Sequence, residues 1–178
     1  MYFIKTERLG LRQLSAEDIE GGYADWLNDG EVCQYNSHHR YPQAKSDLVR
    51  YIQSVESGQD KMVFAIIHLE DATHIGNISL QHINFLDRNA ELAFIIGEKE
   101  YWGNGYAREA GQAVIEHAFT QLNLHRLYLG TLDENVRMQR LALKLGFYEE
   151  GRRKGALYKN GAYHDILEYG MVRQAELM

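Results

Sequence analysis

The sequence predicts an α+β domain in which about four helices flank both faces of a mixed, mostly antiparallel sheet of about seven strands. Three observations lead to this prediction. Runs rich in β-branched and aromatic residues follow one another across short polar turns, which is typical of antiparallel hairpins. Other segments carry apolar residues at helical spacing. One helical segment lies between two strands, and such a crossover joins parallel neighbours, so the sheet is mixed.

The length and composition favour a single globular domain over residues 1–178. Apolar residues make up 45% and charged residues 25% of the chain, which is ordinary for a folded domain. The single cysteine, Cys33, excludes an internal disulfide and is typical of a reducing compartment. The first residues lack a basic segment followed by an apolar core, and no run approaches the roughly 18 apolar residues of a membrane span. We therefore expect a cytoplasmic protein without membrane contact.

The charge and the histidines argue against two kinds of partner. A formal net charge of −6 disfavours non-specific nucleic-acid binding and is compatible with cationic substrates. The eight histidines include the adjacent His38 and His39, and none shows the paired spacing of a zinc site. We therefore expect no nucleic-acid partner and no metal ion. The oligomeric state is open, with a homodimer as one option.

The N-terminal part predicts one strand and two helices. Apolar residues alternate with arginines over Thr6–Leu14, which favours a strand. Ser15 followed by Asp18 resembles a capping box and predicts a helix that runs to Leu27. A second helix is predicted over Ser46–Ser57 and ends at a glycine.

The segment Glu31–Gln43, between these two helices, is rich in polar and aromatic residues. It contains the only proline of the chain, Pro42. Two interpretations stay open for it: a loop that faces the substrate, or a connector packed against the rest of the domain.

The middle of the chain predicts a hairpin and a central strand. The runs Met62–Leu69 and His74–Ile83 are separated by a short polar segment, which favours a hairpin. A turn at residues 87–89 then leads into Ala90–Ile96. In that strand Leu92, Phe94 and Ile96 share one face, while Glu91, Ala93 and Ile95 share the other. Because both faces are mostly apolar, the strand is expected to be central.

The last third completes the crossover and adds a hairpin. The predicted elements are a helix after Gly105, a strand over Leu124–Thr131, a helix over Asn135–Leu145, and strands over Tyr148–Leu157 and Tyr163–Val172. Gly146 is a natural end for the second of these helices. The turn of the last hairpin is Lys159-Asn160-Gly161, and Asn-Gly is the strongest short turn signal.

The stretch Phe94–Ala113 is the strongest functional signal. It runs from the central strand through a turn with Gly103 and Gly105 into a helix, so successive N–H groups and the helix N-terminus can surround a phosphate. Two well-known fingerprints do not match it, because Arg108 stands where a dinucleotide motif needs a small residue and no Gly-Lys-Ser/Thr follows. A tight turn without a ligand is the plain alternative.

Two sequence blocks resemble one family. Trp102–Ala110 reads W-G-N-G-Y-A-R-E-A and resembles the acetyl-CoA pyrophosphate loop of GNAT-type N-acetyltransferases, in the version of the Rim-type enzymes that acetylate ribosomal-protein N-termini. About 30 residues on, Asn135–Phe147 resembles the N-x-R-S-x-R-L-x-x-K-L-G-F helix of the same group. The resemblance implies a GNAT fold, with a V-shaped splay between the fourth and fifth strands, and acetyl-CoA as co-substrate.

The resemblance also implies which residues hold the cofactor. The cofactor-binding residues that it implies are Phe94, Ile95, Ile96, Trp102, Gly103, Asn104, Gly105, Tyr106, Ala107, Asn135 and Arg140. For Asn135 the alternative is a helix N-cap without a ligand, and both roles can hold together. For Arg140 the alternative is an ordinary solvated helix residue. Trp102 and Tyr106 are expected to pack beneath the loop, with backbone groups carrying the binding.

Glu91 is the candidate catalytic base. It is the one carboxylate in an otherwise apolar strand, and it matches a Glu of the Rim-type enzymes that is thought to act through water. The alternative is a structural ion pair with Arg88 or Arg126. A general acid is missing, because relatives carry Tyr at the place of Ala142 or Ser at the place of Met138. Water or a nearby Tyr could serve instead.

The acceptor is the least determined part. Substrate-side candidates are Tyr35, His82, Asn84, Phe85 and Tyr163, each with a structural role as the alternative. The resemblance implies an N-acetyltransferase that acts on a primary amine, with a protein N-terminal α-amine favoured by the Rim-like motifs. A small amine is the rival, such as a polyamine, an aminoglycoside or a nucleotide-linked amino sugar. A non-catalytic acyl-CoA sensor is the alternative from another class.

Overall fold

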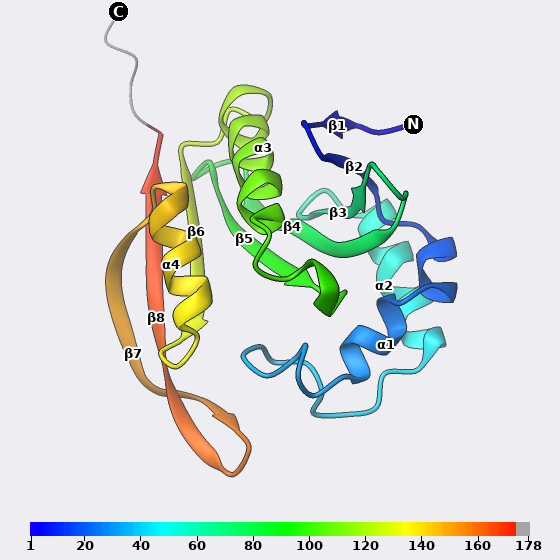
Figure 1. Cartoon of the computed structure of the whole chain (residues 1–178). Coiled ribbons are helices and arrows are strands. Elements are labelled where there is room, and N and C mark those ends of the chain that lie inside the picture. The colour runs from blue at the N-terminus through cyan, green and yellow to red at the C-terminus, as the bar shows by residue number, and fades with distance from the viewer. Residues whose placement is uncertain (174–178) are drawn as a thin grey trace, which may run out of the picture.

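The computed structural model describes residues 1–173, and eight strands in it form one sheet. The strands are β1 (Ile4–Lys5), β2 (Leu9–Gln13), β3 (Met62–His68), β4 (His74–Asn84), β5 (Asn89–Ile96), β6 (Arg126–Leu132), β7 (Tyr148–Lys159) and β8 (Ala162–Val172). Their order across the sheet is β1-β2-β3-β4-β5-β6-β8-β7 (Figure 1). Only β5 and β6 are parallel neighbours. The mixed, mostly antiparallel α+β fold is therefore confirmed, with eight strands instead of about seven.

The extra strand arises at the N-terminus, where the prediction of one strand over Thr6–Leu14 is wrong at its start. Thr6 closes a turn, because its N–H donates to the Leu9 carbonyl oxygen at 2.9 Å. The chain before this turn forms β1 and pairs back on β2. The alternating pattern continues through the turn, so it could not locate the break.

The first predicted helix is also divided. A 3₁₀ helix, η1 (Ala16–Glu20), is followed by α1 (Tyr23–Asn28), with Gly21 and Gly22 between them. A Cβ on Gly22 would lie 2.7 Å from Nε1 of Trp26, so the break brings backbone close to that indole. The predicted start is confirmed, since the Ser15 N–H donates to the Asp18 carboxylate at 2.8 Å.

Helices cover both faces of the sheet (Figure 1). The remaining helices are α2 (Lys45–Ser57), the short 3₁₀ turn η2 (Lys99–Tyr101), α3 (Tyr106–Thr120) and α4 (Val136–Leu145). The helices α3 and α4 pack on one face in a core with Leu92, and α1 and α2 pack on the other face in a core that Ile95 borders. The predicted assignment of β5 side chains to two faces is thus confirmed. Within residues 1–173, no helix combines the length and the apolar character that a membrane crossing requires.

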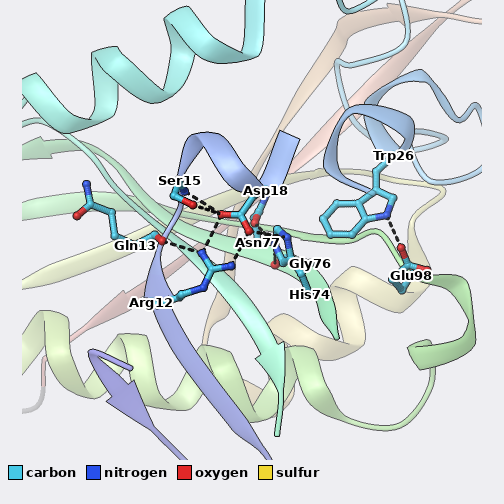
Figure 2. A network of polar contacts seen from close by, with 9 residues as sticks. All are labelled: Arg12, Gln13, Ser15, Asp18, Trp26, His74, Gly76, Asn77 and Glu98. Atoms are coloured by element: carbon cyan, nitrogen blue, oxygen red, sulfur yellow. Dashed lines mark hydrogen bonds and ion pairs between the residues drawn. The ribbon is translucent and has the colours of Figure 1, made fainter. Parts of the chain in front are cut away.

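A buried polar network fixes η1 to the sheet (Figure 2). Asp18 is 5% exposed and accepts hydrogen bonds from the Arg12 guanidinium at 2.6 and 2.8 Å. His74 of β4 faces the same carboxylate at 3.3 Å. Burial alone would raise the pKa of Asp18, but the hydrogen bonds from Arg12, His74 and the Ser15 N–H outweigh it and hold the pKa well below its usual range.

The same region positions α1 beside the end of β5. The Trp26 indole lies against Gly97, where a Cβ would meet the ring at 1.8 Å, so only glycine fits. Its Nε1 donates to the Glu98 carboxylate at 2.9 Å (Figure 2). Gly97 and Glu98, the two residues that follow β5, therefore both contact Trp26 of α1. These contacts hold the end of α1 in place, where the next segment of the chain begins.

Candidate functional site

The central feature of the site is the separation of β5 from β6. The two strands pair only at Asn89, Ala90 and Glu91, which lie opposite residues 126–128. Beyond Glu91, β5 continues to pair with β4 up to Ile96 but no longer with β6. The side chains of Phe94, Ile95 and Ile96 are only partly buried there. The fourth and fifth strands of the prediction, Ala90–Ile96 and Leu124–Thr131, are β5 and β6 in the structure, so the predicted splay is confirmed. It leaves one backbone edge of β5 open to a ligand.

A loop rich in unpaired N–H groups follows β5. Gly103 and Gly105 have φ of +81° and +83°, a conformation that favours glycine, and Gly105 is the N-cap of α3. Among residues 1–173, no acceptor bonds the backbone N–H groups of the six residues from Gly103 to Arg108. Residues 103–105 are exposed. Free donors together with the positive end of a helix can hold a diphosphate.

Glu109 ties this loop to the N-terminal turn. Its carboxylate accepts from the Thr6 hydroxyl at 2.6 Å and from the Arg8 N–H at 2.8 Å, and it pairs with the Arg8 guanidinium at 2.7 Å. Arg8 also donates to the Asn104 carbonyl at 3.1 Å and lies 4.5 Å from the Tyr106 ring centre. Burial would raise the pKa of Glu109, yet these donors lower it. Sequence analysis assigned no role to Arg8, because nothing in its local pattern points to residue 109.

The two aromatic residues of the loop pack beneath it, as predicted. The Trp102 indole donates to the Ile96 carbonyl at 2.8 Å, and the Tyr106 hydroxyl contacts Nε2 of His68 at 3.1 Å. The guanidinium of Arg137, on α4, lies 5.8 Å from the Trp102 ring centre. The loop is therefore supported from below by β3, β5 and α4.

Helix α4 borders the splay from the other side. Asn135 is its N-cap, and its side-chain oxygen accepts from the Met138 N–H at 3.2 Å, which confirms the capping role. Its amide nitrogen bonds no other group among residues 1–173, and Arg140 is exposed. Ala142 is fully buried and Met138 packs against the core, so α4 offers no hydroxyl at either place.

Glu91 lies at the last pair before the strands separate, opposite Tyr128 of β6. Its carboxylate contacts Nδ1 of His82 at 3.1 Å and is 32% exposed. Burial raises the pKa of Tyr128, and the charge of Glu91 raises it further. Glu91, His82 and Tyr128 therefore form a polar group at the mouth of the splay.

The structural alternative for Glu91 named the wrong partners. Arg88 bonds the backbone and side chain of Asn123, and Arg126 pairs with Glu150. Both arginines are thus engaged away from Glu91. The alternating pattern could not identify His82 as the partner, because a bulge in β4 brings it there.

The segment between α1 and α2 is held at both ends. Near its start, the Lys99 ammonium pairs with Asp29 at 2.8 Å and with Glu31 at 2.6 Å. Farther along, the Arg40 guanidinium donates to the Tyr158 carbonyl at 2.9 Å. These contacts favour a packed connector over a free loop, although Tyr41 in it is 77% exposed.

Lys159 makes the main contact between this segment and the β7–β8 hairpin. It is 8% exposed, and its ammonium donates to the carbonyl oxygens of Cys33 and Asn36 at 2.6 Å and of His38 at 3.0 Å. Burial lowers the pKa of Lys159. The sequence placed Lys159 in the hairpin turn and missed this contact, because its acceptors lie more than 100 residues away.

The other predicted substrate residues are spread out. Asn84 uses its side chain within the β4–β5 turn, where it bonds the Leu86 and Asp87 N–H groups at 2.9 and 3.0 Å. Tyr163 is 74% exposed, and its ring packs edge-to-face against Tyr158. Tyr35 is partly buried in the connector. Only His82 contacts Glu91. Within residues 1–173, no group of three or more His, Cys, Asp or Glu side chains could hold a metal ion.

Lys159→Met is expected to lower the free energy of unfolding by about 2–3 kcal/mol, because buried carbonyl groups lose their donor. Residues 29–43 should then be cut more readily in limited proteolysis, and urea denaturation gives the energy. Lys154→Met is the control, since Lys154 lies on the same strand with an 83% exposed side chain and should change stability by less than about 0.5 kcal/mol. Equal stability of both variants would contradict a stabilising role for the hydrogen bonds of Lys159.

Comparisons with known proteins agree with this geometry. Residues 8–148 match the family model described as the acetyltransferase (GNAT) domain. The chain is 36% identical over 158 residues to the spermidine N(1)-acetyltransferase of Escherichia coli. The aligned region covers 88% of this chain and 82% of that protein. It is 30% identical over 176 residues to the uncharacterized N-acetyltransferase YoaA of Bacillus subtilis. That alignment covers 97% of this chain and 98% of the relative.

Solved structures show the same fold. Spermidine N-acetyltransferase from Vibrio cholerae, in complex with CoA and spermine, superposes with a TM-score of 0.86 at 27% identity, over 94% of this chain and 96% of that chain. RimL, the ribosomal L7/L12 alpha-N-protein acetyltransferase in complex with coenzyme A, superposes with a TM-score of 0.88 over 99% of this chain and 100% of that chain. Its identity is 18%, so this likeness concerns the fold alone.

Proposed function

The chain belongs to the GNAT acetyltransferase family and is an acetyl-CoA-dependent N-acetyltransferase, and from this premise we propose that its acceptor is a small polyamine, with spermidine as the model substrate. The observation that carries the proposal is the 36% identity to a spermidine acetyltransferase over 88% of the chain. The Rim-like version of the pyrophosphate loop favours a protein N-terminal α-amine, which is the second candidate. Fold and cofactor site alone do not separate these acceptors.

Charge on the acceptor side supports a cationic substrate. Glu91 on β5 and Glu168 on β8 both raise the pKa of Tyr128 through their charges, so two carboxylates lie around the mouth of the splay. Glu168 is paired with Arg153, whereas no Lys or Arg among residues 1–173 pairs with Glu91, so Glu91 is the less neutralised anionic group for an ammonium. The net charge of −6 adds a long-range attraction for cations.

The free donors of the loop are the proposed site for the diphosphate of acetyl-CoA. In this proposal Gly103, Asn104, Gly105, Tyr106 and Ala107 hold the diphosphate through their N–H groups, and Trp102 supports them. The pantetheine arm bonds the open edge of β5 at residues 94–96, and the Asn135 amide meets the arm from α4. In the same proposal the exposed Arg140 meets a CoA phosphate. Acetyl-CoA then presents its thioester between the separated strands, next to Glu91.

The reaction demands that a proton leave the acceptor before the amine attacks. An alkyl amine with a pKa of about 10.4 costs about 4.6 kcal/mol to deprotonate at pH 7, whereas an α-amine near 7.8 costs about 1 kcal/mol. A polyamine therefore needs base catalysis, which we assign to Glu91 and the His82 ring in contact with it. The leaving thiol, with a cysteine-like pKa of about 8.5, needs little acid help, and water or the Tyr128 hydroxyl supplies its proton.

An acceptor panel tests the proposal. Thiol release from acetyl-CoA is measured with spermidine, spermine, an aminoglycoside and a peptide that carries a free N-terminal serine, each at several pH values. We expect kcat/KM for spermidine to exceed that for the peptide at least tenfold, and the rate to rise with pH as more neutral amine forms. A faster reaction with the peptide would favour the second candidate. Tight CoA binding without turnover of any amine would favour a sensor.

A further inference from the structure

His82 lies in a strained position that the sheet alone does not require. In β4, Gln81 is opposite Glu91, and the next pair is Asn84 with Asn89, so the strand contains a bulge at residues 82–83. His82 has a φ of +50°, which is uncommon for a residue with a side chain and costs about 1 kcal/mol or more. Bulges next to active sites commonly redirect one side chain.

The bulge separates the directions of two neighbouring side chains. Ile83 is 8% exposed and belongs to the core, and its N–H donates to the Asp60 carbonyl at 2.8 Å. His82 is exposed instead, with 69% of its side chain accessible, and its Nδ1 contacts the Glu91 carboxylate at 3.1 Å. The strained backbone therefore holds the imidazole on Glu91.

The contact leaves the other ring nitrogen free. An ionised carboxylate only accepts hydrogen bonds, so the proton between the two groups belongs to Nδ1. In the neutral ring Nε2 then carries the lone pair, and Nε2 bonds no residue among 1–173. Tyr128 faces Glu91 from β6, and the charges of Glu168 and Arg126 act on Tyr128 beyond it. Glu91 is thus the charged group in direct contact with the ring.

We propose that His82 is the catalytic base and that Glu91 is the positioning residue that fixes its tautomer. This rests on the amine-acetylation chemistry but not on spermidine as the acceptor. Nε2 of His82 takes one proton from the acceptor ammonium and later releases it to solvent. The freed nitrogen attacks the thioester carbonyl carbon and forms the C–N bond, the C–S bond breaks, and the second proton of that nitrogen passes to the sulfur through water or the Tyr128 hydroxyl.

The first test reads the tautomer and needs no acceptor. Long-range ¹H–¹⁵N NMR on histidine-labelled protein at alkaline pH should show His82 with the proton on Nδ1. In Glu91→Gln the ring loses its carboxylate partner, and the signal should move toward the Nε2–H tautomer that free histidine prefers. His82→Asn assigns the signal by its disappearance. An Nε2–H tautomer in the wild-type protein would overturn the proposal, whichever amine is the substrate.

The second test distinguishes the proposed base, His82, from the proposed positioning residue, Glu91. His82→Asn keeps a side-chain N–H near the place of Nδ1 and tolerates the positive φ, but it lacks Nε2. We expect kcat/KM for the best amine of the panel to fall about 100-fold, with the KM for acetyl-CoA unchanged. His125→Asn is the matched control, because His125 is exposed and directly precedes β6, outside the group formed by Glu91, His82 and Tyr128, and it should retain wild-type rates.

Each outcome decides between the two roles. Retention of more than half of the wild-type kcat/KM in His82→Asn would mean that the ring only positions Glu91, and the proposal fails. Glu91→Gln should lose about tenfold, less than His82→Asn, because the base remains but its tautomer is no longer fixed. The reverse order of the two losses would return the role of base to Glu91. If no amine is turned over, the acceptor proposal fails, while the NMR result still decides the tautomer.

Discussion

Gly105→Val is expected to weaken the binding of CoA about 10³-fold. A valine at a φ of +83° is strained by about 1–2 kcal/mol, so the free loop should relax to another conformation and the binding of CoA must restore the strained one. The branched side chain would also stand among the N–H groups proposed to face the diphosphate. Loss of one or two hydrogen bonds to a charged group adds about 2–3 kcal/mol. A total near 4 kcal/mol corresponds to roughly three powers of ten in affinity. Isothermal titration with CoA measures the change directly.

Gly161→Val controls for the strain itself. Gly161 lies in the β7–β8 turn with a φ of +84°, and a Cβ there meets no atom within 4 Å. It should therefore lose stability without losing CoA affinity. Wild-type CoA affinity in Gly105→Val would refute the assignment of the diphosphate to this loop. Weakened binding in both variants would point to general unfolding instead.

Asp18→Asn is expected to lower the free energy of unfolding by about 3 kcal/mol at neutral pH. The change keeps the shape of the side chain but leaves the Arg12 guanidinium beside a neutral, buried partner. The network in Figure 2 would then hold η1 to the sheet more weakly. Urea denaturation at pH 7 gives the difference.

The pH dependence of this difference follows from the lowered pKa of Asp18. A carboxylate whose pKa is lower in the folded than in the unfolded state contributes stability that is present above the unfolded value, near 3.9. That contribution is lost as the pH falls through the folded value, so the stabilities of wild type and Asp18→Asn should converge in acid. Asp60→Asn, which changes an exposed carboxylate, should differ little from wild type at any pH. A gap that stays constant down to pH 3 would contradict the argument.

Local chemistry predicted most of the fold. The Asn160-Gly161 turn, with φ of +52° and +84°, and the helix end at Gly146, with φ of +94°, follow from residues that accept positive φ. The two faces of β5 follow from alternation. The splay, however, came from family resemblance, since no pattern within one strand reports where its neighbour departs. The break at Gly21 and Gly22 was missed because the helical spacing continues across it.

The candidate site was only partly accessible from sequence for the same reason. Gly103 and Gly105 could be assigned because the anion cradle lies within a few consecutive residues. The partners that complete the site are distant in the chain: Lys159 reaches the Cys33 carbonyl across 126 positions, and Thr6 reaches Glu109 across 103. Such contacts leave no periodicity in either segment. His82 was named as a substrate residue, but its strained backbone and its contact with Glu91 became visible only in three dimensions.

The short pairing between β5 and β6 affects how the folded protein opens and how a ligand stabilises it. Only three residue pairs join the two halves of the sheet, so this seam is where the molecule should open first. If the arm of the coenzyme bonds the free edge of β5, as proposed, binding stabilises this seam, and at 100 times its dissociation constant the coenzyme adds about 2.7 kcal/mol to the free energy of unfolding. In limited proteolysis, saturating acetyl-CoA should therefore slow the cleavage of the folded chain.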